Sequence, residues 1–109
     1  MDARIPVVAD QLLLIERELR RLGWWAAVAP EAERLASIEP FCVDTLAFEE
    51  WLQWIFLPRM KMLIEQQAPL PGACALLPMA EVVWAARGEQ VAVLLRLLDE
   101  FDRLLAAGA

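Results

Sequence analysis

Few residues of this chain could perform catalysis. None of its 109 residues is histidine, which removes the commonest general base and the commonest metal ligand. Its two cysteines, Cys42 and Cys74, have no C-x-x-C spacing, so we expect small buried side chains rather than a redox pair or a metal site. Catalysis would have to rely on carboxylates, a thiol, Lys61 or an arginine. The sequence predicts no metal site and no cofactor.

Arg59 is the central member of the residues that are best suited to bind a ligand. It is the only cation between Arg34 and Lys61. In an apolar setting its guanidinium is expected to pair with a carboxylate of the chain itself. The candidate carboxylates are Asp44, Glu50 and Glu81. The alternative is that Arg59 holds the carboxylate of a ligand or a partner, with Thr45 and Gln53 as neutral donors beside it.

The tryptophans offer a second type of site. Trp51 and Trp54 are three residues apart, and together with Trp84 they could line an aromatic pocket. Large side chains on a helix that is apolar all round more often belong to the core, so both interpretations stay open. The adjacent Trp24 and Trp25 follow a helix end and cannot both face one interior, so we expect one of them to be exposed.

The charge of the chain narrows its possible partners. Ten Lys and Arg against 16 Asp and Glu give a net charge of −6, and only Arg20 and Arg21 are adjacent cations. Phosphate backbones and anionic lipids attract proteins chiefly through clustered Lys and Arg. Nucleic acid is therefore disfavoured as the main partner, and a protein partner or a second copy of the chain is favoured.

The sequence pattern also bears on location. Residues 1–4 lack the basic and apolar pattern of a secretory signal. The longest uncharged stretch, residues 66–80, is shorter than a membrane span and contains three prolines. We expect a cytoplasmic protein without a membrane segment.

The elements that position these residues are predicted to be helices of one all-α domain, which takes in the whole chain. Apolar residues at steps of three and four run through residues 5–22, and Gly23 ends this first helix. Leu13 and Leu14 widen its apolar stripe and predict contact with more than one neighbour. A short helix is expected after Pro30, where acidic residues occupy the first turn.

The central helix is expected to begin at Asp44 and Thr45, whose side chains could cap it. The run that follows is apolar on nearly every side, so other helices should enclose it. Pro58 removes the amide that would bond the carbonyl of Trp54, so the helix must kink or restart there.

Two further helices are predicted after an irregular connection over residues 68–78, where Pro71 and Gly72 fit the centre of a type II turn. The first covers residues 79–87 and the second begins at Glu89. Their short connection predicts an antiparallel hairpin. The expected architecture is a helical bundle of four main helices plus a short one.

Several short motifs resemble one bacterial family, the YqcC-like proteins. The matching motifs are P-F-C-V-D-T at residues 40–45, E-W-L-Q-W at 50–54, P-R-M at 58–60 and P-L-P-G-A at 69–73. The resemblance covers almost the whole chain and implies an all-helical bundle whose function is not established. It brings no known catalytic residues to this sequence. Met79 and Ala80 stand where an aromatic residue is expected in relatives.

Members of this family are sometimes labelled tRNA pseudouridine synthase C, which implies an association with that enzyme. Under direct activity, Asp44 would be the candidate catalytic residue, because pseudouridine formation needs an aspartate beside a uridine held in a basic cleft. An acidic chain of this size leaves little room for such a cleft. The favoured alternative is that Asp44 and Thr45 cap the central helix.

Three functions stay open at this point. The favoured one is a non-enzymatic interaction module, whose proline-rich loop and neighbouring apolar surface bind a partner protein or a second copy. The second is an accessory or component role in tRNA pseudouridine modification, which the resemblance implies. The third is a small-molecule binder that uses Arg59 and the tryptophans.

Overall fold

The computed structural model describes residues 2–72 and 74–107, and every regular element within these ranges is helical. The elements are α1 (Ile5–Arg21), α2 (Ala32–Leu35), the 3-10 turn η1 (Pro40–Cys42), α3 (Phe48–Trp51), the π-helical segment η2 (Leu52–Phe56), α4 (Leu57–Glu65), α5 (Leu76–Val83), the 3-10 turn η3 (Gly88–Val91) and α6 (Ala92–Ala107). The predicted all-α class is confirmed. Within the same ranges, no helix has the length and apolar character that a membrane crossing requires.

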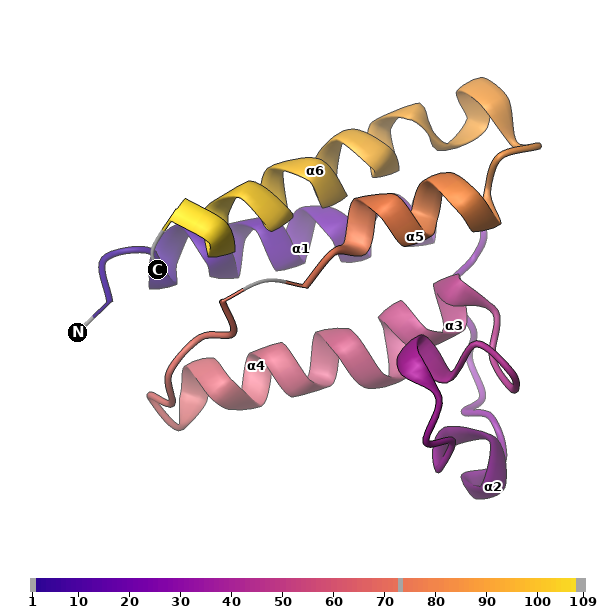
Figure 1. Cartoon of the computed structure of the whole chain (residues 1–109), viewed down its shortest axis with the longest axis horizontal. Coiled ribbons are helices and arrows are strands. Elements are labelled where there is room, and N and C mark those ends of the chain that lie inside the picture. Colours follow the sequence, from indigo (N-terminus) through magenta and orange to yellow (C-terminus); the bar gives the residue numbers. More distant parts are fainter. Residues whose placement is uncertain (1, 73, 108–109) are drawn as a thin grey trace.

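The helices form a bundle around one apolar core (Figure 1). α1 and α6 run side by side in opposite directions, α5 lies against α6, and the run from α3 to α4 completes the bundle next to α1. α2 stands apart from the bundle, before η1 and α3. The largest fully buried side chains come from every long helix and include Ile15, Leu52, Met60, Leu76 and Phe101.

α1 follows its prediction closely. Its apolar stripe is buried, and Gly23 stops the helix with a φ of 77°, a left-handed conformation that glycine adopts without steric cost. The expectation that α1 contacts more than one neighbour is confirmed, because it packs against both α6 and α4, although the side chains of Leu13 and Leu14 stay 60% and 40% exposed. α1 thus presents two leucines to solvent.

The central helix begins later than predicted, at Phe48 rather than at Asp44 and Thr45. The N-cap residue is Ala47, which has no side-chain acceptor. Its backbone N–H instead donates to the carboxylate of Glu50 at 2.9 Å. The predicted cap at Asp44 and Thr45 was therefore wrong, because a carboxylate three residues inside the helix satisfies the backbone there.

The interruption predicted at Pro58 lies in the π-helical segment just before it. Pro58 has no N–H, so the carbonyl of Trp54 lacks its ordinary helical partner. Over Leu52–Phe56 the helix widens instead, and the N–H of Leu57 donates to the carbonyl of Leu52, five residues back. The chain then continues directly into α4, so a single helical run covers residues 48–65.

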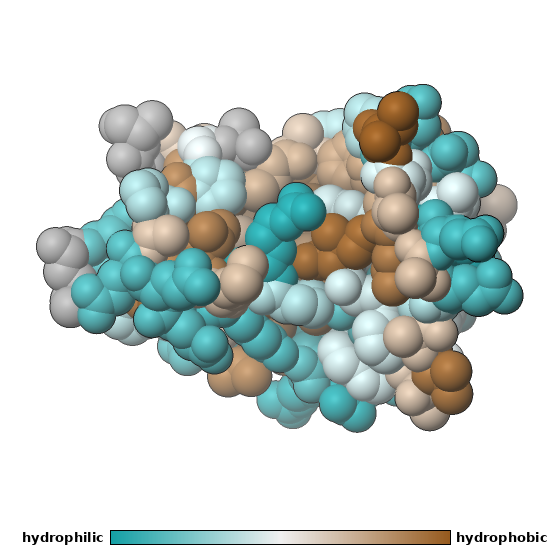
Figure 2. Space-filling view, turned by 90° about the horizontal axis from the view of Figure 1, so that it is seen from below, coloured by the Kyte–Doolittle hydropathy of each residue, from teal (hydrophilic) through white to brown (hydrophobic). Residues whose placement is uncertain are grey.

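This central run is less enclosed than its composition predicts. Leu52 and Phe56 are buried, but Trp51, Trp54 and Ile55 are only half-buried. Figure 2 shows the molecule from below, where hydrophobic atoms lie in a hollow bordered by hydrophilic side chains. Apolar surface is thus not confined to the core.

α5 and α6 form the predicted antiparallel hairpin, but their bounds differ from the prediction. α5 begins at Leu76 instead of Met79, because the carboxylate of Asp102 in α6 accepts hydrogen bonds from the N–H groups of Leu76 and Leu77 at 3.0 and 2.8 Å. This carboxylate, which belongs to a neighbouring helix, caps the start of α5. Its negative charge also interacts favourably with the positive end of the α5 helix dipole. α5 ends at Val83, four residues before the predicted end.

Candidate functional site

Thr45 and Glu50 are joined to Arg34 rather than to Arg59. The guanidinium of Arg34 donates to the carbonyl of Thr45 at 2.9 Å and to the carboxylate of Glu50 at 3.0 Å. The hydroxyl of Thr45 in turn donates to the carbonyl of Arg34 at 2.7 Å. These contacts fasten α2 to the start of α3, so this cluster braces the fold.

Asp44 lies apart from that brace. It is exposed, and its carboxylate accepts a hydrogen bond from the hydroxyl of Ser37 at 2.5 Å. Ser37 precedes η1, so this contact closes a surface turn. Among the residues that the structure describes, no cation forms an ion pair with Asp44.

Arg59 and Glu81 are both exposed, on α4 and α5. The expected ion pair between Arg59 and Asp44, Glu50 or Glu81 was wrong, because no carboxylate in residues 2–72 and 74–107 lies within ion-pair distance of its guanidinium. Pro58 and Arg59 follow the widened turn of the helix on its solvent side. A charged group in water gains little from pairing, so the chain leaves Arg59 solvated.

Gln53 is buried, and each end of its side-chain amide forms a hydrogen bond. Its side-chain oxygen accepts from the N–H of Ala26 at 2.8 Å, and its side-chain nitrogen donates to the carbonyl of Ala26 at 2.8 Å. The amide thus pairs with one backbone residue in the link between α1 and α2. Gln53 anchors this link, which makes it a poor donor for a ligand near Arg59.

The aromatic side chains form one packed cluster. The ring of Trp51 lies 4.9 Å from that of Phe41 and 5.7 Å from that of Phe48, centroid to centroid. Trp84 lies 5.2 Å from Trp24, and its indole nitrogen donates to Glu49 at 3.3 Å. These rings belong to the edge of the core, so Trp51 and Trp84 do not line an open pocket with Trp54.

The adjacent tryptophans after α1 are both half-buried, so the prediction that one is exposed was wrong. Trp24 packs on Trp84, whereas Trp25 lies under the guanidinium of Arg20, whose central carbon is 4.5 Å from the ring centroid. The two rings thus pack against different neighbours. A different side chain partly covers each ring.

Trp25 and Trp54 line a surface groove of about 580 Å³ between the end of α1 and the central run. We call it the Trp25–Trp54 groove. Its principal lining residues are Arg20, Trp25, Gln53, Trp54, Pro58 and Lys61. Arg59 and Trp51 do not line it, so the groove shares Gln53 and Trp54 with the predicted binding residues and takes its cations from elsewhere.

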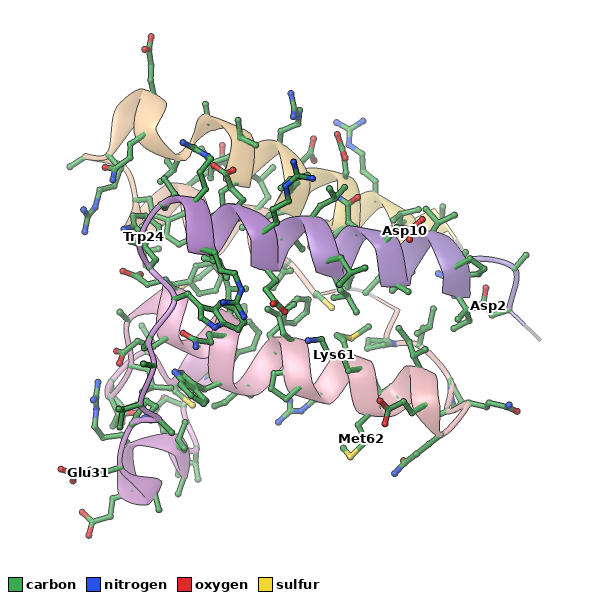
Figure 3. All side chains as sticks on the ribbon, turned by 180° about the vertical axis from the view of Figure 1, so that it is seen from behind. Asp2, Asp10, Trp24, Glu31, Lys61 and Met62 are labelled. Carbon is green, nitrogen blue, oxygen red and sulfur yellow. The ribbon has the colours of Figure 1, made fainter. Side chains whose placement is uncertain are left out.

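Two cations at this groove share one carboxylate. Nε of Arg20 lies 3.1 Å from one oxygen of Glu16, and Nζ of Lys61 lies 3.2 Å from the other. Figure 3 shows Lys61 between α4 and α1. Partial burial of Glu16 disfavours its ionised form, but the hydrogen bonds from Lys61 and Arg20 outweigh it and lower the pKa of Glu16. The ionised carboxylate therefore holds both cations in place.

Two further hollows lie along the contact between α1 and α4. The larger, of about 480 Å³, has a mixed lining that includes Ile5, Ile64 and Pro69 as well as the polar Asp2 and Gln67. The smaller, of about 220 Å³, has an almost wholly apolar lining that includes Ala9, Leu13 and Ile64. Because Ile64 lines both, they form one strip from the proline-rich loop to the middle of α1. We call this strip the apolar seam.

The cysteines do not form a chemical site. Cys42 is buried and Cys74 half-buried, and both are free thiols. Burial and the nearby negative charge of Asp102 raise the pKa of Cys74 to about 11, so its thiol stays protonated at neutral pH. No group of three or more Cys, Asp or Glu residues in the described part of the chain is placed to hold a metal ion.

A family model described as DUF446, tRNA pseudouridine synthase C, matches residues 7–104. The chain belongs to this family. The Escherichia coli protein named "Uncharacterized protein YqcC" is 38% identical over 99 residues, which are 91% of both chains. A solution NMR structure of YqcC from E. coli matches with a TM-score of 0.87 at 36% identity, over 99% of this chain and 92% of that one.

Other relatives match over a shorter segment. A Pectobacterium carotovorum protein named tRNA pseudouridine synthase C is 50% identical over 64 residues, which are 59% of this chain but only 17% of that protein. A Haemophilus influenzae protein named "Uncharacterized protein" is 44% identical over 63 residues, 58% of this chain and 59% of that one. This chain thus matches only a minor part of the relative that carries the enzyme name.

Sequence reasoning missed the cations of the Trp25–Trp54 groove. The spacing of Glu16 and Arg20 indicates a helical ion pair, and this pair is present. Nothing local indicates that Lys61, 45 residues after Glu16, completes it. That contact depends on how α4 packs against α1.

Proposed function

We propose that this DUF446 protein is a non-enzymatic interaction module and that its partner is a tRNA pseudouridine synthase. The observation that carries the proposal is the apolar seam with the solvent-exposed leucines beside it. Leu13 lines the seam and is 60% exposed, and Leu14 next to it is 40% exposed. Contiguous apolar surface on a soluble protein commonly marks a site of association.

The seam has the character of a protein-docking surface. Fully burying one leucine side chain stabilises a complex by about 1.5–3 kcal/mol, so two half-exposed leucines could contribute a similar amount together. Arg17 is exposed on the same helix and gives the surface a charged border. A partner with apolar side chains and an acidic group at the edge would complement it.

The choice of partner is supported by the Pectobacterium relative. The segment similar to this chain is a minor part of a protein named tRNA pseudouridine synthase C. A module attached to an enzyme is held at high local concentration, whereas a separate module must reach the enzyme through an interface of its own. The apolar seam would supply that interface.

Direct catalysis by this chain has weaker support. A pseudouridine synthase needs an aspartate in a cationic cleft that holds RNA phosphates. Asp44 is exposed and bonded to Ser37, and the net charge of the chain is −6. A partner role therefore accounts for the family description better than an active site at Asp44.

The proposal can be tested by isothermal titration of this protein with the tRNA pseudouridine synthase C of its own source organism. We expect saturable binding that weakens at least about tenfold when Leu13 and Leu14 are both replaced by serine, a loss of about 1.4 kcal/mol. Val82→Ser is the matched control, because Val82 is 75% exposed on α5, on the other side of the bundle from α1.

Absence of binding by the unmodified protein would overturn the proposed partner. Equal weakening by the control and by the double variant would overturn the proposed surface. Light scattering on the protein alone measures its molar mass in solution. Self-association through the seam would identify a second copy of the chain, instead of the synthase, as the occupant of this surface.

A further inference from the structure

The Trp25–Trp54 groove combines features of a small-molecule site that the interaction proposal does not use. Its volume of about 580 Å³ lies within the usual range of ligand pockets, about 300–1,000 Å³. Three separate segments build its walls: the end of α1, the link after it and the central helical run. The amide of Gln53 holds the link against that run, so the groove is already formed without a ligand.

The cations at the groove have donors to spare. Arg20 and Lys61 together carry two positive charges, and Glu16 supplies one negative charge between them. A guanidinium has five N–H donors and an ammonium has three, but each cation gives only one hydrogen bond to Glu16. The charges of these three side chains sum to one positive charge, with unused donors, on a protein of net charge −6.

The two indoles give the groove flat apolar walls. Trp25 is half-buried under the guanidinium of Arg20, which fixes the position of that cation. Trp54 is also half-buried, and its indole nitrogen is a buried donor with no acceptor in the described part of the chain. An unpaired buried donor of this kind costs the folded chain free energy.

We infer that the Trp25–Trp54 groove binds a small molecule in which a planar ring carries a carboxylate or a phosphate. The ring packs against Trp25 and Trp54, and the anion joins Arg20 and Lys61. The acidic surface elsewhere disfavours polyanions, so the ligand is a small anion and not a nucleic acid strand. This inference does not depend on the binding of a synthase.

The test uses matched probes that differ only in the anion. Indole-3-acetate is compared with indole-3-acetamide for the carboxylate, and uridine 5′-monophosphate is compared with uridine for the phosphate. Indole N–H signals in ¹⁵N-labelled protein report the binding of each probe. We expect at least one anionic probe to shift the signals of Trp25 and Trp54 and to bind about tenfold tighter than its neutral counterpart.

Variants locate the site. Lys61→Met should weaken binding of the anionic probe about tenfold and leave binding of the neutral probe unchanged. Arg96→Gln is the control, because Arg96 pairs with Glu100 on α6 and does not line the groove. The carboxylate and phosphate arms identify which anion the groove prefers.

Three results would overturn the inference. They are the absence of shifts with either anionic probe, equal binding of the anionic and neutral probes, and equal weakening by Lys61→Met and Arg96→Gln. Amide spectra of both variants show directly that they remain folded.

Discussion

Replacing Gln53 by methionine is the perturbation whose outcome follows most directly from the geometry. The substitution keeps the length of the side chain but removes both hydrogen bonds to Ala26, each 2.8 Å long. One such bond contributes about 1 kcal/mol to stability. Ala26 is exposed, so water can replace part of the loss. We therefore expect the free energy of unfolding to fall by about 1–2 kcal/mol.

Urea unfolding followed by tryptophan fluorescence measures this change in free energy. In a separate thermal unfolding experiment, the melting temperature should fall by about 4–8 °C for a domain of this size. Gln66→Met is the matched control at the end of α4, because the exposed side chain of Gln66 forms no hydrogen bond within the described residues. Its effect should stay within about 0.5 kcal/mol. Equal effects of the two substitutions would refute the view that Gln53 anchors the link to the central helix.

Three further outcomes are expected. Asp102→Ala should lower the free energy of unfolding, measured in urea, by about 1–2 kcal/mol, because it removes the cap of α5. The control Asp99→Ala breaks only a surface ion pair with the solvated Arg103 and should lower the free energy of unfolding by less than about 0.5 kcal/mol. Cys74, with its pKa raised to about 11, should react with iodoacetamide at pH 8 roughly two hundred times more slowly than an ordinary thiol, and the rate should climb as the pH approaches 11. Arg59→Ala should leave the free energy of unfolding in urea unchanged within error, because Arg59 is solvated. A decrease of more than about 1 kcal/mol would contradict this and indicate an intramolecular partner for Arg59.

The elements that sequence predicted best are those fixed by local pattern. The apolar period of α1 and its glycine stop are properties of neighbouring residues, so the predicted and observed ends agree within a residue. The interruption before Pro58 follows in the same way from one missing N–H, although its form, a π-helical segment, was not predicted.

The errors arose where a distant residue decides the local structure. α5 begins at Leu76 because Asp102, on another helix, accepts its first N–H groups. Arg34 takes the carboxylate of Glu50 that was expected for Arg59, because α2 folds back onto the start of α3. Spacing along the chain carries no signal for either contact, since both depend on tertiary packing.

The candidate site likewise combines a residue that the sequence pattern drew attention to with residues that only tertiary packing brings beside it. Trp54 was considered for a pocket with Trp51 and Trp84 or for the core, and the structure places it, half-buried, in the wall of a groove that neither of those tryptophans lines. Its companions Arg20, Trp25 and Lys61 come from other segments and were not predicted to join it. The binding role of the predicted residues stays a prediction.

The central proposal, that this protein is a module which docks through α1, is tested most directly by an amide NMR titration of the ¹⁵N-labelled protein with a tRNA pseudouridine synthase C. We expect signals from residues 5–17 and from the proline-rich loop (residues 68–72) to shift or broaden first, while those of α5 stay in place. Unchanged spectra at saturating synthase, or changes centred on α5, would contradict it.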